Sequence, residues 1–139
     1  MKIVILGAGE VGSHLAKMLS LEANDITIID DDPQRLAGIS AIADVITVQG
    51  ASSSLRTMRE AGVQDADLFI SVVPSVPQEV NIVSALLAKN LGAGKVTARI
   101  DDNDFLSAEN KLLFKQMGIE LMFYPERLAA DEIYDLLKH

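Results

Sequence analysis

Hydrophobic and polar positions alternate between two kinds of segment along almost the whole chain. Six short segments are rich in Val and Ile and apolar at successive positions, a pattern typical of parallel strands buried on both faces. The segments between them place apolar residues at helical spacing. The expected strands are Ile3–Leu6, Ile26–Ile29, Val45–Val48, Leu68–Val73, Val96–Ile100 and Ile119–Phe123, and the expected helices are Val11–Leu21, Pro33–Ile42, Ser53–Ala61, Gln78–Leu91, Phe105–Met117 and Glu126–Lys138.

Capping residues agree with these boundaries. Asp32, followed by proline, predicts a helix N-cap, and Gly62, Gly92 and Gly118 each follow an expected helix end. Strands that alternate with helices build an α/β fold. We expect a Rossmann-type, doubly wound sheet of six parallel strands in the order 3-2-1-4-5-6. No linker, repeat or low-complexity stretch divides the sequence, so we expect one domain over residues 1–139.

The last helical segment follows a sheet that is already complete. Its apolar residues lie along one stripe, at Leu128, Ala129, Ile133, Leu136 and Leu137. Such a stripe packs either on the edge strand of the same sheet or on a second copy of the chain. The spacing alone leaves both interpretations open.

Composition and charge exclude several classes of partner. The 139 residues carry 12 Lys and Arg against 20 Asp and Glu, a net charge of −8, and no basic cluster interrupts the trend. Because polyanions are bound through basic residues that displace their counterions, we expect neither nucleic acid nor anionic lipid as a partner. No apolar run reaches the roughly 18 residues of a membrane span, so direct membrane insertion is not expected.

Cysteine is absent from the chain, which removes disulfides, thiolate nucleophiles and zinc–thiolate sites. The first residues follow a strand pattern and lack the basic region and cleavage site of a signal peptide. We therefore expect a cytoplasmic location.

A glycine motif follows the first expected strand. Its residues are Gly7, Ala8, Gly9, Glu10, Val11 and Gly12. In a G-x-G-x-x-G motif between a strand and a helix, the glycines provide a tight turn, close approach of the backbone to a pyrophosphate, and close packing of helix on strand. The amides at the helix start then face the phosphates, and the helix dipole favours their charge. The motif predicts a site for a nucleotide.

An acidic residue at the end of the second strand supplies the partner that this motif requires. A carboxylate at Asp30 can accept both hydroxyls of an adenosine ribose and repels a 2′-phosphate, which favours NAD(H) or a plain adenine nucleotide over NADP. The alternative is that the run from Asp30 to Asp32 only caps the next helix. We prefer that alternative for Asp32 and assign Asp30 and Asp31 to the predicted site.

The residues of a catalyst are missing beside this site. A dehydrogenase also needs a substrate region and a general acid or base that faces the nicotinamide. The histidines are His14, expected on the polar face of the first helix, and His139, the last residue. Tyr134 and Lys138 have the Tyr-x-x-x-Lys spacing of short-chain dehydrogenases, but they lie on the last helix without a preceding serine. We expect no catalytic residue.

The acidic run Asp101-Asp102-Asn103-Asp104 does not continue as a calcium-binding EF-hand loop, because the required glycine and glutamate are absent. We interpret the run as the capped start of a helix that begins at Phe105. A weak divalent site at a subunit interface is the alternative, and we assign no metal site.

Five stretches of the sequence, in this order, are similar to one known family: MKIVILGAGEVGSHLAKML, ITIIDDDPQRL, LRTMREAGVQDADLFISVV, EVNIVSALLAKNLGAGKVTARI and FKQMGIELMFYPERLAADEI. The chain resembles, over essentially its whole length, the TrkA-N regulatory domains of potassium-uptake proteins, also called RCK or KTN domains. The REAGVQDAD and PERLAADEI blocks are more specific than the glycine motif, which all Rossmann domains share.

The resemblance implies a cytoplasmic regulator attached to an integral-membrane potassium transporter on the inner face of the cell membrane. In that family the domains dimerise and build rings, and bound NAD(H) or ATP/ADP changes their relative geometry and gates transport. NAD(H) is the expected ligand here, with ADP, ATP or AMP as alternatives. Relatives carry a further lobe, so the resemblance also implies a fragment or stand-alone domain whose last helix crosses to a partner.

Carried over by position, the resemblance assigns roles to residues that follow the strands. It implies that Gly7 to Val11 hold the phosphates, Asp30 the adenosine ribose, Gly50, Ala51 and Ser52 the adenine, Val73 and Pro74 the second nucleoside, and Arg99 the phosphate or distal sugar. All of them lie at carboxyl strand ends around the switch point of the sheet, where ligands bind in open α/β folds.

Three departures from the family pattern bear on the ligand. Ala51 stands where the family usually has an acid, which removes an acceptor near the adenine or ribose. Glu10 stands where some ATP-responsive relatives have arginine, and its charge repels a γ-phosphate, which favours NAD(H) or ADP over ATP. The stretch from Pro74 to Pro77 replaces a more acidic loop, so the resemblance says less about the second half of the site.

Three functions are compatible with these features. The first is a ligand-gated regulatory subunit, the second the nucleotide-binding fragment of an NAD-dependent oxidoreductase, and the third a scaffold whose site has decayed. Ala51 favours the scaffold, whereas the intact glycines and Asp30 argue against it. The interpretation as a regulatory subunit explains most of these sequence features.

Overall fold

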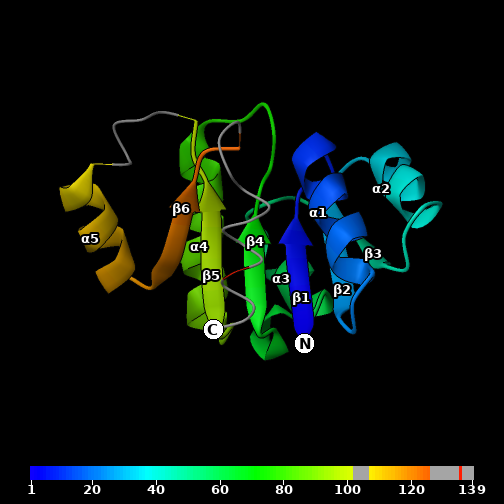
Figure 1. The fold of residues 1–139 in the computed structure, drawn as a ribbon, viewed down its shortest axis with the longest axis horizontal. Coiled ribbons are helices and arrows are strands. Elements are labelled where there is room, and N and C mark those ends of the chain that lie inside the picture. The colour runs from blue at the N-terminus through cyan, green and yellow to red at the C-terminus, as the bar shows by residue number, and fades with distance from the viewer. Residues whose placement is uncertain (102–106, 126–134, 136–139) are drawn as a thin grey trace.

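Six parallel strands form one sheet in the computed structural model, with helices on both faces (Figure 1). The structure describes residues 1–101, 107–125 and 135. The strands are β1 (Lys2–Leu6), β2 (Asp25–Asp30), β3 (Ile46–Gln49), β4 (Leu68–Ser71), β5 (Lys95–Arg99) and β6 (Ile119–Phe123). The helices are α1 (Glu10–Ser20), α2 (Pro33–Ser40), α3 (Leu55–Glu60), α4 (Gln78–Leu91) and α5 (Ala108–Gln116), with a short 3-10 turn η1 (Val63–Asp65). The order β3-β2-β1-β4-β5-β6 confirms the predicted fold.

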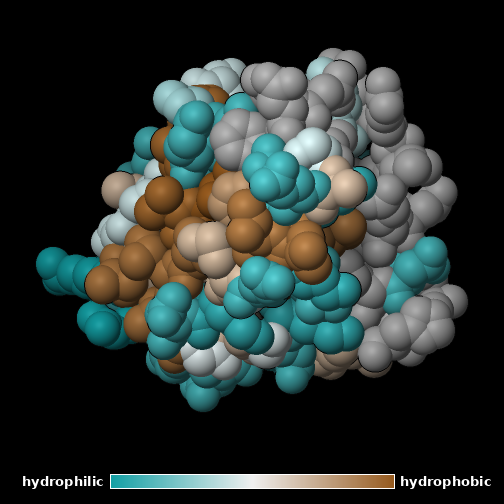
Figure 2. All heavy atoms as spheres, turned by 90° about the vertical axis from the view of Figure 1, so that its left-hand side faces the viewer, coloured by the Kyte–Doolittle hydropathy of each residue, from teal (hydrophilic) through white to brown (hydrophobic). Residues whose placement is uncertain are grey.

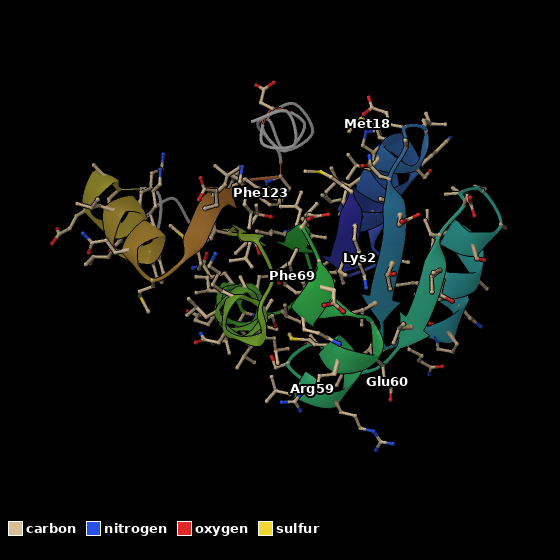
Figure 3. All side chains as sticks on the ribbon, turned by 90° about the horizontal axis from the view of Figure 1, so that it is seen from below. Lys2, Met18, Arg59, Glu60, Phe69 and Phe123 are labelled. Carbon is tan, nitrogen blue, oxygen red and sulfur yellow. The ribbon has the colours of Figure 1, made fainter. Side chains whose placement is uncertain are left out.

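Alternate residues of each strand face opposite sides of the sheet, and both sides are largely buried in β1, β2, β4 and β5, whereas the edge strand β3 is mostly exposed. Ile3 belongs to the core under α1 and α2, which includes Leu15 and Leu36. Val4 belongs to the core under α3 and α4, which includes Phe69, and Figure 3 shows the two helical layers on either side of the sheet. Burial on both faces is the reason that these strands are continuous apolar runs in the sequence.

The predicted helix caps are present. Asp32 is the N-cap of α2, and its Oδ1 accepts a hydrogen bond from Gln34 N at 2.9 Å. Gly62, Gly92 and Gly118 follow α3, α4 and α5 with positive φ angles, the conformation expected of glycine after a helix end.

Most predicted boundaries lie within two residues of the observed ones, and the differences at the end of β4 and the start of α5 have identifiable causes. β4 ends at Ser71 instead of Val73, because the backbone N and O of Val73 bond to the side chain of Asn81 and not to the sheet. α5 begins at Ala108, and the predicted start at Phe105 lies outside the described residues. Its N-cap is Ser107, whose Oγ accepts from the backbone N of the third residue of the helix at 3.3 Å, so the acidic run 101–104 does not cap it. The helix predicted over 126–138 lies, except for one residue, outside the described part of the chain.

Candidate nucleotide-binding site

The glycine loop joins the end of β1 to the start of α1 and contacts the loop after β4. Gly7 has a φ of 110°, and a β-carbon there would lie 2.8 Å from the carbonyl oxygen of Val72. A β-carbon at Gly12 would overlap the carbonyl oxygen of Gly7. The loop can therefore take this compact form only with glycine at both positions, which explains glycines that would otherwise weaken the strand and the helix.

The first turn of α1 presents backbone amides at the carboxyl edge of the sheet. Gly9 is the N-cap, and the first helical hydrogen bond runs from Ser13 N to Gly9 O at 2.9 Å. The amides that precede Ser13 in the helix have no acceptor within it, and the positive end of the helix dipole lies there. This geometry suits an anionic group such as a phosphate. Glu10, the first helical residue, is exposed at the same end.

Asp30 ends β2 with only 4% of its side chain exposed. Its Oδ2 accepts a hydrogen bond from Ala8 N at 2.7 Å, and its Oδ1 accepts one from Asp32 N at 2.8 Å. The guanidinium of Arg35 lies 3.8 Å from Oδ2 and partly balances the buried charge. A carboxylate offers about four acceptor positions, and two backbone donors leave room for further donors such as ribose hydroxyls.

The loop after β3 lies beside Asp30. Gly50 N donates to Asp30 O at 3.0 Å, which continues the pairing of β3 with β2 by one residue. A β-carbon at Gly50 would overlap the side chain of Thr57 in α3, so the loop and this helix are in close contact. Ala51 is exposed, and Ser52 is half-buried.

The loop after β4, residues 72–77, approaches the glycine loop from the other side. A β-carbon at Gly9 would lie 2.7 Å from Pro74 Cγ, which places Pro74 directly against the glycine motif. Three separate loops, after β1, β3 and β4, thus meet at the carboxyl ends of the strands around Asp30.

These loops border one pocket. It is lined by Leu6, Gly7, Ile29, Asp30, Asp31, Arg35, Gly50, Ser52, Val73 and Val76. The site residues predicted from the sequence that line it are Gly7, Asp30, Asp31, Gly50, Ser52 and Val73. The remaining predicted residues of the three loops and the α1 start do not line the pocket; they are Ala8, Gly9, Glu10, Val11, Gly12, Ala51 and Pro74.

Arg99 is the predicted site residue that does not lie at this pocket. It ends β5, which β4 separates from β1, and its Nε donates to Asp101 Oδ1 at 3.1 Å. Its assignment to a phosphate or distal sugar stays a prediction. Sequence reasoning in turn missed Arg35, which pairs with both Asp30 and Asp32. The sequence does contain a signal for this pairing: Arg35 follows the N-cap Asp32 by three residues, and residues three apart lie side by side on a helix.

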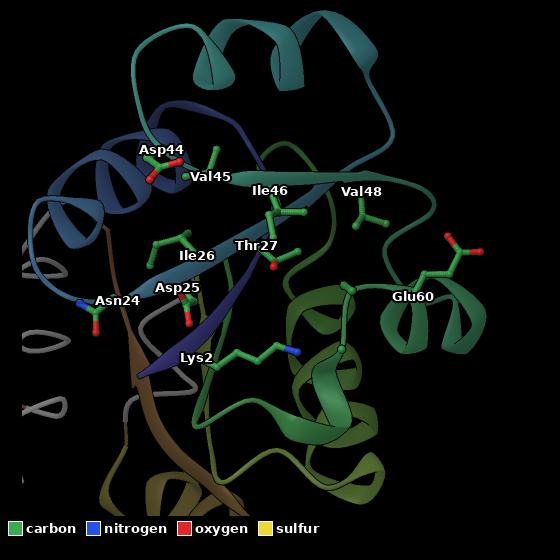
Figure 4. A pocket seen from close by; sticks show the side chains of 12 residues that line it. Lys2, Asn24, Asp25, Ile26, Thr27, Asp44, Val45, Ile46, Val48 and Glu60 are labelled. Atoms are coloured by element: carbon green, nitrogen blue, oxygen red, sulfur yellow. The ribbon is translucent and has the colours of Figure 1, made fainter.

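A second hollow lies at the opposite, amino-terminal edge of the sheet (Figure 4). Its lining includes Lys2, Thr27, Ile46 and Glu60. It exists because the short helix α3 leaves part of the β2–β3 face uncovered, so that Ile46 is 66% exposed. The hollow is separated from the pocket at Asp30 by the length of β2.

Other candidate chemistry is limited in the described residues. His14 is exposed on α1, as the sequence predicts, whereas Tyr134 and Lys138 lie outside the described part of the chain. Within that part, no cluster of three or more His, Cys, Asp or Glu residues could hold a metal ion. None of the described helices has the length and apolar character needed to cross a membrane.

The family model of the TrkA-N domain matches residues 3–125. The chain belongs to the TrkA-N family. Among its TrkA-N relatives is the Trk system potassium uptake protein TrkA of Halomonas elongata, 36% identical over 140 residues that cover 100% of this chain and 30% of that protein. The TrkA protein of Haemophilus influenzae is 38% identical over 141 residues, again 100% of this chain and 30% of that protein. The chain thus spans 30% of the length of these relatives.

Solved structures share the fold of this TrkA-N domain. The GsuK channel bound to NAD superposes with a TM-score of 0.69 at 14% identity, over 87% of this chain and 21% of that one. The Kef C-terminal domain of Shewanella denitrificans in AMP-bound form gives 0.65 at 19% identity, over 100% and 83%. YwfH, an NADPH-dependent reductase, gives 0.57 at 15% identity, over 84% and 64%. Because an enzyme and a channel domain share this architecture, the fold does not decide between catalysis and regulation.

Proposed function

We propose that this chain is the nucleotide-sensing regulatory domain of a potassium-uptake system and that it binds NAD(H) at the carboxyl end of its sheet. The observation that carries the proposal is the hydrogen bond from Ala8 N to Asp30 Oδ2. It fixes a buried carboxylate beside the free amides of α1, so that an acceptor for ribose hydroxyls and donors for phosphates lie next to each other.

The residues of the three loops fit an adenine dinucleotide. The amides at the start of α1 would hold the phosphates, and Asp30 the adenosine ribose. The loop at Gly50–Ser52 borders the adenine, and Val73 with Pro74 lies under the second nucleoside. Glycine at positions 7 and 12 lets the loop keep its compact form, because a β-carbon at either position would collide with backbone atoms. ADP, ATP or AMP would use the first half of the same site, and the AMP-bound Kef domain and NAD-bound GsuK channel support both kinds of ligand for this fold.

The side chains that line the pocket favour a regulatory role over catalysis. The titratable side chains that line it are Asp30, Asp31 and Arg35. Among the described residues that line this pocket, none is a histidine, lysine or tyrosine of the kind that transfers a proton in dehydrogenases. The relatives named above are potassium uptake proteins, which agrees with a domain that binds the nucleotide without turnover.

Regulation requires that the ligand bind two arrangements of the domains unequally. A nucleotide with equal affinity for both arrangements shifts nothing, however tightly it binds. We propose that NADH and NAD, or ATP and ADP, differ in this respect, and that the difference gates a membrane potassium transporter from the cytoplasmic side. The nucleotide site supplies the input, and a surface that contacts other domains transmits it.

A surface of that kind lies on α4 and α5. Helix α5 has no buried residue, and four apolar side chains on these two helices and at the C-cap of α5 are about half exposed: Val83 46%, Leu112 59%, Leu113 50% and Met117 54%. Figure 2 shows apolar side chains gathered on this face of the molecule. We call these four residues the α4–α5 surface. Its apolar character supports a homodimer or larger ring, since monomers rarely expose such patches.

Titration calorimetry of the purified chain with NADH, NADPH, AMP and ATP tests the proposed ligand. We expect NADH to bind, and NADPH to bind at least about tenfold more weakly because Asp30 repels the 2′-phosphate. Clear preference for ATP would contradict NAD(H) as the ligand and our interpretation of Glu10. Oxidation of NADH with turnover would favour an oxidoreductase instead, and failure of all four to bind would favour the decayed scaffold.

A further inference from the structure

One buried side chain of α4 ties the end of β4 to the loop that follows it. Asn81 lies near the start of α4 and is fully buried. Its Oδ1 accepts hydrogen bonds from Ser71 Oγ at 2.9 Å and from Val73 N at 2.8 Å, and its Nδ2 donates to Val73 O at 3.0 Å. These bonds therefore reach the last residue of the strand and a residue that lines the pocket.

The loop held by Asn81 has an unusual backbone. Ser75 has a φ of 58°, and it is the one non-glycine residue with positive φ in the described part of the chain. It lies between Pro74 and Pro77, which fix their own φ angles. A non-glycine residue keeps a positive φ only where surrounding contacts hold the backbone in place. The shape of this loop therefore depends on contacts such as those of Asn81.

A different side chain of the same helix holds the loop after β3. Ser84 is fully buried three residues after Asn81. Its Oγ donates to Ser52 O at 3.4 Å and lies 3.4 Å from Ser53 Oγ. Ser52 lines the pocket on the side of Gly50. Helix α4 thus holds both loops, each through its own side chain.

On the basis of the proposed function, we propose that Asn81 is the positioning residue that makes the site prefer a dinucleotide to a mononucleotide. Asn81 holds Val73, and Val73 with Pro74 borders the second nucleoside. A loop that is already ordered adds no ordering cost when the ligand binds, and the apparent affinity rises with the fraction of molecules in the competent shape. Val73 lines the same pocket as Asp30, but AMP ends before the second nucleoside, so its affinity depends on this loop less than that of NADH does. Ser84 supports the first half of the site, which both ligands share.

The experiment compares NADH with AMP by titration calorimetry on the full chain, its Asn81→Ala variant and the matched Ser84→Ala variant. For Asn81→Ala we expect NADH affinity to fall by about tenfold or more and AMP affinity to change by less than about twofold. For Ser84→Ala we expect both affinities to fall by the same factor. Circular dichroism and thermal unfolding confirm that each variant is folded.

The ratio of the two affinities separates positioning from general support of the fold. If Asn81→Ala weakens NADH and AMP equally, or weakens neither, the proposed role of Asn81 is wrong although the site binds nucleotides. If the unaltered chain binds neither ligand, the proposed function itself has failed.

A milder variant covers the case in which Asn81→Ala does not fold. Ser71→Ala removes one of the hydrogen bonds that orient the Asn81 side chain and leaves the asparagine in place. We expect NADH affinity to fall by about threefold, in line with the loss of one hydrogen bond, while AMP affinity stays the same. An equal change for both ligands would overturn the proposal.

Discussion

Asp30 Oδ2 and the backbone N of Ala8 are joined by a hydrogen bond of 2.7 Å, which connects the end of β2 to the glycine loop after β1. The same carboxylate accepts from Asp32 N, so one buried side chain orders the glycine loop and the start of α2 together. Asp30 therefore acts on both the fold and the proposed ligand, and a single substitution should affect both.

Asp30→Ala should abolish or severely weaken nucleotide binding. The variant removes the acceptor for the ribose hydroxyls, and we expect NADH affinity to fall by about 100-fold, which corresponds to the loss of two hydrogen bonds to a charged group. It also leaves Ala8 N and Asp32 N without their acceptors, which should lower the free energy of unfolding by about 1–3 kcal/mol. Titration calorimetry and urea denaturation measure the two effects.

The matched control for Asp30→Ala is Asp25→Ala. Asp25 begins the same strand, is exposed, and lies at the opposite edge of the sheet. Its loss should leave NADH affinity unchanged. Unaltered NADH binding in Asp30→Ala would show that the ribose is read elsewhere, and equal losses in both variants would indicate a general effect of charge.

Two glycine-to-alanine substitutions should change stability in opposite directions. A β-carbon at Gly12 would overlap Gly7 O, so Gly12→Ala should lower the free energy of unfolding by about 3 kcal/mol or more. Gly38 lies in α2, and a β-carbon there would meet open space, so Gly38→Ala should raise the free energy of unfolding by about 0.5–1 kcal/mol through helix propensity. Urea denaturation of both variants measures the difference. Equal effects would mean that Gly12 does not pack against the Gly7 carbonyl as described.

The architecture could be predicted from the sequence because its determinants are local. Strands buried on both faces are continuous apolar runs, and a glycine such as Gly118 marks the end of a helix through its own backbone angles. The proximity of the glycine motif to Asp30 could be predicted as well, since the topology alone brings the end of the second strand beside the first loop.

The features that could not be predicted depend on contacts between distant residues. β4 ends early because the side chain of Asn81, ten residues beyond the end of the strand, replaces the sheet as the partner of Val73. The N-cap of α5 is Ser107 and not the acidic run that we expected, because helical spacing alone does not decide which residue near the start of a helix caps it. The helical spacing of apolar residues in α5 does not show whether they are covered, and Leu112 and Leu113 are exposed.

Glu10→Gln should increase the affinity for ATP more than the affinity for NADH. Glu10 lies at the start of α1 and its negative charge opposes a γ-phosphate, but it is exposed and solvent screens its interactions. We therefore expect a modest gain, about two- to fivefold for ATP at low salt, that shrinks as the salt concentration rises. Titrations at two salt concentrations measure this. Glu22→Gln, beyond the other end of α1, is the control, and an equal gain in both variants would attribute the effect to net charge instead of position.

The α4–α5 surface should mediate self-association. Leu112→Glu places a charge at an apolar contact between copies, where it would be desolvated without a partner, so we expect sedimentation velocity to shift from an oligomer to a monomer. Because Leu112 is 59% exposed, the substitution should change the free energy of unfolding of the single chain by less than about 0.5 kcal/mol. The loss of association would then reflect the surface and not the fold.

Leu21→Glu is the control that separates this surface from exposed leucine in general. Leu21 is the C-cap of α1, is 80% exposed and lies outside the α4–α5 surface. Introducing the same charge there should leave the sedimentation coefficient unchanged. If the unaltered chain is monomeric at every concentration, or if both variants dissociate equally, the contact between copies does not use α5. In that case we expect the apolar residues of α5 to contact a different protein domain, and Leu112→Glu to weaken that contact without changing the behaviour of this chain alone.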